Sequence, residues 1–400
     1  MMPFNDFWSL QTAIFTVIFL AVVFVSAQKK TIAGPMSKET SNELRGLAIL
    51  GILFAHLTYG KFYGTEFLFP LGIWSGPAVN LFFFLSGYGL AASLIYHPKP
   101  IREFYLKRVL KIYLPLWIFL TAILLMDAFI LGRSYPSREI MFAFFGYYPE
   151  ANFFDSFNSP LWFLTPMLFY YLVFPLIFRA KHPRISVAAI FAASLLAFWP
   201  YWPVSEQVLR FYQAHWLAFP LGVLFAALIV SSREVCAVCL RNGRCLTYKW
   251  LLSAWSRNKN ACAKPLAAAI DWLQSLPSAW RWAAMSALAV LAWQTAYHSG
   301  VGKGLWLEQS YALFTMACLV LLFAFKKYKL RFLETVGAYS FEIYLWHWPL
   351  IGRYDLLYAY LPPWLATALY LPLLLLIAYF FNRLASAIEK KIFRKEKIPA

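Results

Sequence analysis

The chain has 400 residues, of which 61% are hydrophobic and only 14% are charged. Soluble globular chains carry roughly 25% charged residues, so this composition excludes an ordinary soluble domain and favours a polytopic membrane protein. The formal net charge of +18 does not indicate nucleic-acid binding, because the Lys and Arg residues are distributed between apolar runs, as in the cytoplasmic loops of membrane proteins.

Apolar runs long enough to cross a bilayer recur along the whole chain, and they predict an all-α, polytopic transmembrane bundle of about eleven helices. They lie near residues 8–27, 44–60, 74–96, 110–131, 160–179, 185–200, 213–231, 283–298, 306–325, 336–352 and 363–382. The first run has a signal-peptide alternative, since residues 25–27 resemble a cleavage site. However, the residues before this run include Asp6 but no Lys or Arg, and Lys29 and Lys30 follow the run. We therefore expect an uncleaved helix.

The Lys and Arg residues also predict the orientation of the bundle. If the connection 28–45 is cytoplasmic, 30 of the 36 Lys and Arg residues lie on that side. The other six lie on the opposite side: Lys61, Arg133, Arg138, Arg210, Lys303 and Arg353. Because cytoplasmic loops are enriched in Lys and Arg, we expect a multi-pass protein of the inner (plasma) membrane, with the N-terminus outside and the C-terminus in the cytoplasm.

The largest predicted cytoplasmic segment, 232–282, is polar to amphipathic, and we expect helices that lie on the membrane surface. It holds four of the five cysteines: Cys236, Cys239, Cys245 and Cys262. An odd number of cysteines argues against a disulfide framework. The spacing of these four fits no common zinc site and no His lies near them, so we expect no metal.

The segment NELRGLAILGILFAHLTY, residues 42–59, predicts an apolar helix with two ionisable residues on one face. Arg45 and His56 are eleven residues apart, which places them about 20° apart around the axis and about 16 Å apart along it. Two interpretations are open. The pair can serve a long ligand that runs from one membrane surface into the bilayer, or Arg45 can reach the interface while His56 packs against a neighbouring helix.

A second apolar segment, SFEIYLWHWPL, carries Ser340 and His347 on one helix face, with Tyr344 one position off that stripe. The predicted topology places His347 at a depth similar to that of His56. The two imidazoles can therefore line one cavity, or each can be an unrelated packing residue. The other polar groups inside predicted membrane segments, Asp127, His215 and Glu342, are interpreted as packing partners without an assigned role.

The segment FYLKRVLKIYLP, residues 104–115, leads from the predicted cytoplasmic side into a helix. Lys107, Arg108 and Lys111 cluster on one helical turn, and Arg108 and Lys111 are neighbours at i,i+3. Such a cluster can bind phosphate groups. The simpler alternative is that these residues only flank a membrane helix on its cytoplasmic side.

Taken together, five segments resemble motifs of the acyltransferase-3 family of integral-membrane acyltransferases, which includes bacterial O-antigen and other surface-glycan O-acetylases. The helix with Arg45 and His56 is similar to the family's R-x10-H. The other four, in the order in which the family has them, are LFFFLSGYGL, FYLKRVLKIYLPLW, LWFLTPMLFYYLVFPL and SFEIYLWHWPL. The resemblance covers residues 42–383. Two segments resemble additions to a ten-helix core: residues 1–41, with their helix, and the cysteine-bearing segment. Residues 384–400 are predicted to form a basic cytoplasmic tail.

Three positions depart from the family pattern. Lys111 stands where Arg is usual, which keeps the charge but loses the bidentate fork. Asn80 stands where Asp is common. Met167 stands where many members have Glu, so a role for that acid does not carry over.

The resemblance implies transfer of an acyl group, usually acetyl, from cytoplasmic acyl-CoA to a hydroxyl of an outward-facing glycan or lipid-linked sugar, with no permanently bound cofactor. The partners expected are acyl-CoA, the sugar acceptor and membrane lipids, without nucleic acid. Arg45, Lys107, Arg108 and Lys111 are the candidates for donor binding. His56 is the favoured general base and His347 its competitor, and an acyl-His56 intermediate stays open. The candidates for lining the acceptor site are Asn80, Ser86, Tyr88, Trp162, Ser340 and Tyr344.

Two other classes of function compete with this interpretation. A secondary transporter also uses buried His and Arg, to carry protons or to bind an anion. Transporters are commonly built from two related halves with broken helices, and the sequence shows no such symmetry. A scaffold for polysaccharide assembly has no need of Arg45 and His56 on one stripe.

Overall fold

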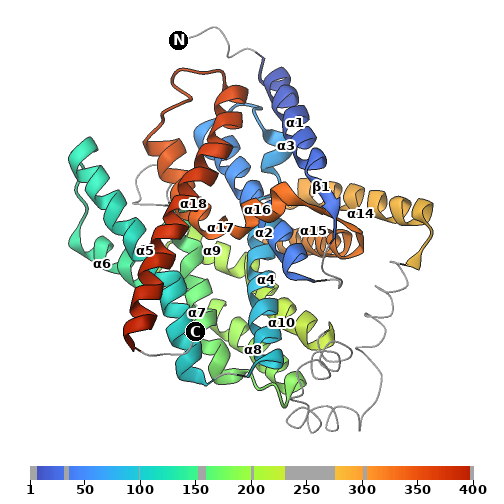
Figure 1. The fold of residues 1–400 in the computed structure, drawn as a ribbon, viewed down its shortest axis with the longest axis vertical. Coiled ribbons are helices and arrows are strands. Elements are labelled where there is room, and N and C mark those ends of the chain that lie inside the picture. Colours follow the sequence, from blue (N-terminus) through green and yellow to red (C-terminus); the bar gives the residue numbers. More distant parts are fainter. Residues whose placement is uncertain are drawn as a thin grey trace.

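The computed structural model describes residues 7–30, 36–98, 100–151, 159–199, 202–229, 275–300 and 304–396. These residues form a helical bundle, and their only sheet is a pair of three-residue strands (Figure 1). The first half comprises α1 (Trp8–Val25), β1 (Ala27–Lys29), α2 (Lys38–His56), the π-helical turn η2 (Leu57–Lys61), α3 (Phe69–Gly72), α4 (Ser75–Tyr96), α5 (Ile101–Leu131), α6 (Ser137–Phe145), the 3-10 turn η3 (Ser159–Phe163) and α7 (Leu164–Ile177).

The second half comprises α8 (Pro183–Phe198), α9 (Glu206–His215), α10 (Ala218–Ile229), α14 (Ser278–His298), α15 (Leu305–Phe325), β2 (Tyr328–Leu330), α16 (Arg331–Ala338), α17 (Ser340–Trp348), the π-helical turn η4 (Pro349–Arg353) and α18 (Pro363–Glu396). Every predicted apolar run contains a helix. Three runs differ in detail. The run 213–231 is broken at Trp216 and Leu217 between α9 and α10, and the run 336–352 is broken at Tyr339 between α16 and α17. The third difference is that α18 continues as one helix into the segment predicted to be a tail.

Seven helices in the described part of the chain are long and apolar enough to cross a membrane, which confirms the predicted all-α membrane bundle. They are Trp8–Val25, Phe69–Tyr96, Ile101–Leu131, Pro160–Ile177, Glu206–Ile229, Leu305–Phe325 and Pro363–Ile392. The helices α8 and α2, from two of the other predicted runs, are not among these seven. Helix α8 has only 16 residues, and α2 begins with a charged turn. The count of eleven spans stays a prediction.

The centre of the bundle is α2, which packs against α4, α16 and α17. A pair of glycines lets α2 and α16 approach backbone to backbone. A Cβ on Gly46 would lie 2.0 Å from the carbonyl oxygen of Leu333, and a Cβ on Gly337 would lie 1.8 Å from that of Asn42. No larger side chain fits at either position, so these glycines fix the distance of α2 from the segment that leads to His347.

The start of α2 is tied to the connection between α15 and α16. Strand β1 pairs antiparallel with β2, so that Ala27 lies opposite Leu330. Below this sheet the carboxylate of Glu43 is fully buried and accepts from Lys326, while Glu39 accepts from Lys329 at 2.9 Å. Buried charges are retained where they are paired, and these pairs fix the helix that carries Arg45.

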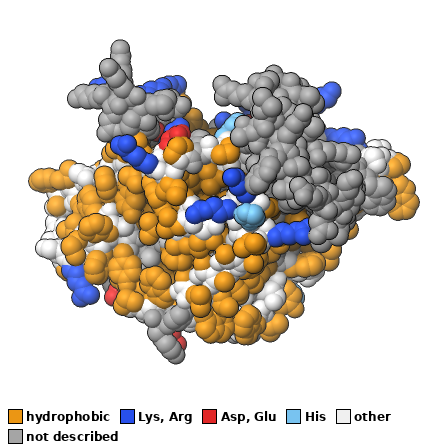
Figure 2. All heavy atoms as spheres, turned by 90° about the horizontal axis from the view of Figure 1, so that it is seen from below, with side chains coloured by type: hydrophobic (Ala, Val, Ile, Leu, Met, Phe, Trp, Pro, Cys, Tyr) orange, Lys and Arg blue, Asp and Glu red, His pale blue; other side chains and the backbone are white. Residues whose placement is uncertain are grey.

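Figure 2 shows the face of the molecule at which α18 ends, seen from below relative to Figure 1. Lys and Arg side chains are spread over it among hydrophobic ones, and few Asp or Glu side chains are visible. This is the face that the charge distribution predicts to be cytoplasmic.

Candidate active site

Two imidazoles from separate helices meet near the centre of the bundle. His56 is the last residue of α2, and His347 is the penultimate residue of α17. Nδ1 of His56 lies 2.7 Å from Nε2 of His347, and the two rings are nearly parallel, at 11°. The structure thus joins, by a direct hydrogen bond, two residues that are 291 positions apart in the chain.

The surroundings of His347 set the direction of this hydrogen bond. Nδ1 of His347 lies 2.7 Å from the carbonyl oxygen of Tyr344, and a carbonyl oxygen only accepts, so the proton of a neutral His347 is on Nδ1. Its Nε2 then accepts from Nδ1–H of His56. In this arrangement His56 carries its basic lone pair on Nε2. The result is a relay from a backbone carbonyl through His347, which is fully buried, to His56.

His347 is also fixed from the side that follows it in the chain. The turn η4 ends at Arg353, which donates to the fully buried carboxylate of Asp127 in α5. The same carboxylate accepts from Tyr135 at 2.7 Å and from Tyr354 at 2.6 Å. Asp127 is therefore a packing partner, as the sequence suggested, and it anchors the segment that begins directly after His347.

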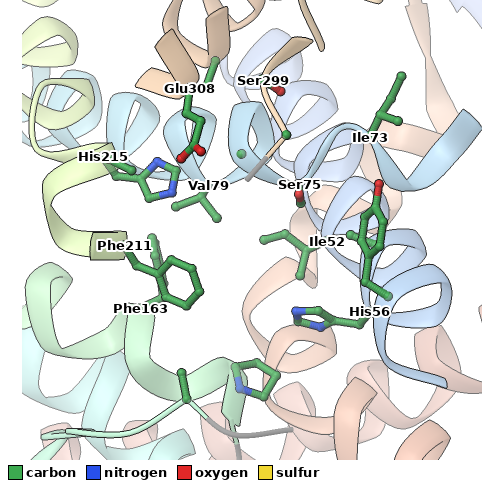
Figure 3. Close-up of a pocket in the computed structure, with 18 of the residues that line it drawn as sticks. Ile52, His56, Ile73, Ser75, Val79, Phe163, Phe211, His215, Ser299 and Glu308 are labelled. Atoms are coloured by element: carbon green, nitrogen blue, oxygen red, sulfur yellow. The ribbon is translucent and has the colours of Figure 1, made fainter. Parts of the chain in front are cut away.

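His56 lines a large cavity of about 1030 Å³. The walls are mostly aromatic and aliphatic, with Phe163 and Tyr344 on the side of the imidazole pair and Trp162 against His215. Figure 3 shows His56 on one wall, with Ile52 beside it and His215 on the opposite wall. The cavity reaches Ser75, Glu206 and Ser299, at the ends of α4, α9 and α14 that are predicted to face outward.

Two of the predicted donor-binding cations lie together at the other end of α2. Arg45 donates to Asn42 in the preceding turn at 3.3 Å, and Arg108 and Tyr171 are its electrostatic neighbours. The guanidinium of Arg108 lies 5.5 Å from the ring centre of Tyr171. Arg45 and Arg108 therefore form a cationic cluster between α2 and α5, next to α7.

The other two predicted cations have different surroundings. Lys107 forms an i,i+4 ion pair with Glu103 at 3.0 Å, and Lys111 is an exposed residue on α5. In the described residues no contact joins either Lys to Arg45. The structure thus divides the predicted set of four into a pair that lies together and two lysines on the surface of α5.

The residues predicted to line the acceptor site separate in the same way. Trp162 and Tyr344 line the cavity, and the hydroxyl of Tyr344 donates to the carbonyl of Pro160. Ser86, Tyr88 and Ser340 are not among the described residues that line it. Ser86 accepts from Tyr171 at 3.5 Å, next to the cationic cluster, and Tyr88 donates to the carbonyl of Met36 at 3.3 Å.

Among the cavity residues to which the sequence assigned no role are Arg210, His215 and Glu308. Arg210 of α9 donates to Glu308 of α15 at 2.9 Å, and Nδ1 of His215 lies 2.8 Å from Oδ1 of Asn80. Asn80 is fully buried behind His215, so it belongs to the site as a support. The available signal was the polar face of the segment 206–215, directly before an apolar run.

No group of three His, Cys, Asp or Glu side chains that could hold a metal ion occurs in the described ranges. The cysteines predicted to be unliganded, Cys236, Cys239, Cys245 and Cys262, lie outside those ranges. The fifth cysteine, Cys318, is buried in α15.

The fold and the site together define a multi-pass membrane protein with an imidazole pair at the wall of a cavity that reaches one side of the bundle. Residues 42–383 match the family model described as an acyltransferase domain, and the chain belongs to this family. It is therefore an acyltransferase, and the resemblance found in its motifs is confirmed. Neither the search of curated proteins nor the search of solved structures found a match.

Proposed function

We propose that the protein transfers an acetyl group from acetyl-CoA on the cytoplasmic side to a hydroxyl of a glycan or lipid-linked sugar on the opposite side of the inner membrane. The observation that carries this proposal is the relay from the Tyr344 carbonyl through His347 to His56, whose imidazole lines the cavity. A base that is oriented before the acceptor arrives suits the activation of a weak nucleophile such as a sugar hydroxyl.

The proposed chemistry needs one proton acceptor that later becomes a proton donor. Nε2 of His56 takes the proton of the acceptor hydroxyl while the hydroxyl oxygen attacks the thioester carbonyl carbon. The carbon–sulfur bond breaks, and the coenzyme A thiolate takes the proton from the His56 imidazolium. The sugar ester and free coenzyme A are the products. His347 acts through His56 by fixing its tautomer and ring plane, and the positive charge on His56 is shared through their hydrogen bond.

The length of α2 supports a donor that enters from the cytoplasmic side. Arg45 and His56 are separated by about 16 Å along the helix, which is about half the thickness of a hydrocarbon core. Arg45 and Arg108 supply charge for the phosphates of coenzyme A, and its pantetheine arm carries the thioester toward His56. The donor then never has to cross the membrane, because only the acetyl group is passed on.

Membrane vesicles of defined orientation test this proposal. Inverted vesicles expose the cytoplasmic face, so acetyl-CoA with a labelled acetyl group, added outside, should label glycan enclosed in the lumen as a base-labile ester. Right-side-out vesicles given the same donor should show no labelling until they are permeabilised. Labelling of intact right-side-out vesicles by external acetyl-CoA would contradict the proposed sidedness. Absence of labelled ester in every preparation that contains the protein would reject the donor or the acceptor class.

A covalent route through acetyl-His56 is the alternative to direct transfer. It predicts that purified protein mixed with labelled acetyl-CoA, without acceptor, releases one equivalent of coenzyme A in a burst and retains the label on the residues around His56. Direct transfer predicts neither the burst nor the retained label.

A further inference from the structure

A second imidazole faces the cavity from the wall opposite His56. His215 is the last residue of α9, and Figure 3 shows its ring directed into the cavity beside Glu308. Two aromatic rings lie roughly parallel to it, Trp162 at 6.1 Å and Phe83 at 6.4 Å between centres. Helix α9 thus places an imidazole at the cavity, and the neighbouring aromatic rings restrict the plane of that imidazole.

The hydrogen bond behind His215 determines which nitrogen serves the cavity. Nδ1 lies 2.8 Å from Oδ1 of Asn80, an amide oxygen that only accepts, so a neutral His215 donates from Nδ1 and accepts through Nε2. Asn80 is fully buried, and its Nδ2 has no hydrogen-bond partner in the described part of the chain. A buried amide that leaves a donor unmatched is unfavourable, and its place behind the imidazole indicates that it serves to hold His215.

The charge of the same wall limits what His215 can bind. The cavity lining within the described residues contains two acids, Glu206 and Glu308, and one permanent cation, Arg210. Arg210 is already paired with Glu308 at 2.9 Å. A ligand group that carries a negative charge would therefore meet an excess of carboxylates, whereas hydroxyl groups can donate to the carboxylate and to the imidazole. Aromatic walls with a few fixed polar groups are typical of sites for such partly polar ligands.

We propose that this wall is a subsite for an uncharged sugar unit of the acceptor, and that His215 is a positioning residue that accepts a hydrogen bond from one of its hydroxyls. The inference rests on the proposed function, and it names the acceptor class more narrowly. His56 activates the reacting hydroxyl on one side of the cavity, and His215 holds the sugar from the other side. Asn80 acts through His215 by fixing its tautomer.

The acceptor used for the test is the envelope glycan of the producing cells, freed of its esters by mild base. With purified protein, His215→Leu should raise the KM for this glycan by roughly fivefold or more, because a net hydrogen bond is lost. Its affinity for acetyl-CoA, measured by calorimetry, should stay within about twofold of the wild type. His215→Gln, which retains a polar side chain, should recover part of the KM. His97→Gln, on an exposed residue at the far end of α4, is the matched control and should change neither value.

An unchanged KM in His215→Leu would overturn the positioning role. A parallel loss of acetyl-CoA affinity would show that His215 only supports the fold. The charge of the sugar is tested with the same glycan after its carboxyl groups have been reduced to alcohols. An equal or lower KM for the reduced glycan is expected, and loss of acceptor activity on reduction would overturn the uncharged assignment. If the wild type transfers no acetyl group to either glycan while it still binds acetyl-CoA, the proposed function itself fails.

Discussion

The two ends of α2 are built differently. At the His56 end, a relay of short hydrogen bonds continues through His347 to a backbone carbonyl, and Asp127 anchors the turn that follows. At the Arg45 end, the guanidinium donates to Asn42 of its own helix at 3.3 Å and lies near a second cation, Arg108. The proposed base is thus held in place before any substrate binds. In the described residues no ion pair with a carboxylate joins Arg45 or Arg108, so these two neighbouring cations are suited to an anionic ligand. Variants at the two ends should therefore affect different kinetic constants.

The largest effect is expected at His56. His56→Ala removes the proposed proton acceptor, so kcat for acetyl transfer should fall by about 10²–10⁴-fold, the usual contribution of general acid–base catalysis. Affinity for acetyl-CoA should be nearly unchanged, because the cationic cluster lies at the other end of the helix. Steady-state kinetics and calorimetry on the same preparation check both values. Near-normal turnover in this variant would refute the assignment.

His347→Ala should have a smaller effect of the same kind. The base is still present, but nothing selects its tautomer or ring plane, and misplacement of a catalytic group costs roughly 10²-fold. The decrease should appear in kcat and leave the Kd of acetyl-CoA unchanged. If His347→Ala abolishes transfer while His56→Ala is active, the roles of the two residues are reversed.

Arg108→Ala should act on the donor and leave the chemistry intact. Loss of one charge-assisted contact to a phosphate typically costs about 1.5–3 kcal/mol, so the affinity for acetyl-CoA should weaken by roughly tenfold or more. The value of kcat at saturating donor should be close to that of the wild type. Binding measured with acetyl-CoA and with dephospho-CoA shows which phosphate is involved. An unchanged donor affinity would leave Arg108 only as a marker of membrane orientation.

Lys107→Ala is the matched control and should give the smallest effect. Lys107 precedes Arg108 directly, but its ammonium is paired with Glu103 on the surface of α5. Exposed i,i+4 pairs contribute about 0.3–0.5 kcal/mol. The Kd of acetyl-CoA and the equilibrium constant of unfolding should therefore each change by less than about threefold. A loss of donor affinity as large as that of Arg108→Ala would show that both residues contact coenzyme A.

Much of the fold could be predicted because a membrane constrains sequence more strongly than water does. Every apolar run contains a helix. The placement of Arg45 and His56 on one helix face follows from their eleven-residue spacing and from helical geometry alone. The break at Tyr339 between α16 and α17 could not be predicted, because apolar residues continue across it in the sequence. The strand pair β1–β2 was missed because three residues are too few for a periodic pattern.

The site was predictable only in part, because it depends on contacts between residues that are far apart in the sequence. The sequence could place His56 and His347 at one depth, but which ring nitrogen carries the proton depends on the Tyr344 carbonyl and is visible only in three dimensions. His215 was passed over because its partner Asn80 is 135 residues away. Lys107 and Arg108 look equivalent in the sequence, and their different surroundings depend on Tyr171, which packs from another helix.

The central claim is that His347 contributes to catalysis only through His56. A double-mutant cycle on kcat for acetyl transfer tests it most directly, with His56→Ala, His347→Ala and the double variant compared with the wild type at saturating donor and acceptor. The relay predicts strong non-additivity, in which the double variant is no slower than His56→Ala alone. Additive losses, with the double variant slower than His56→Ala by the full factor lost in His347→Ala, would contradict it.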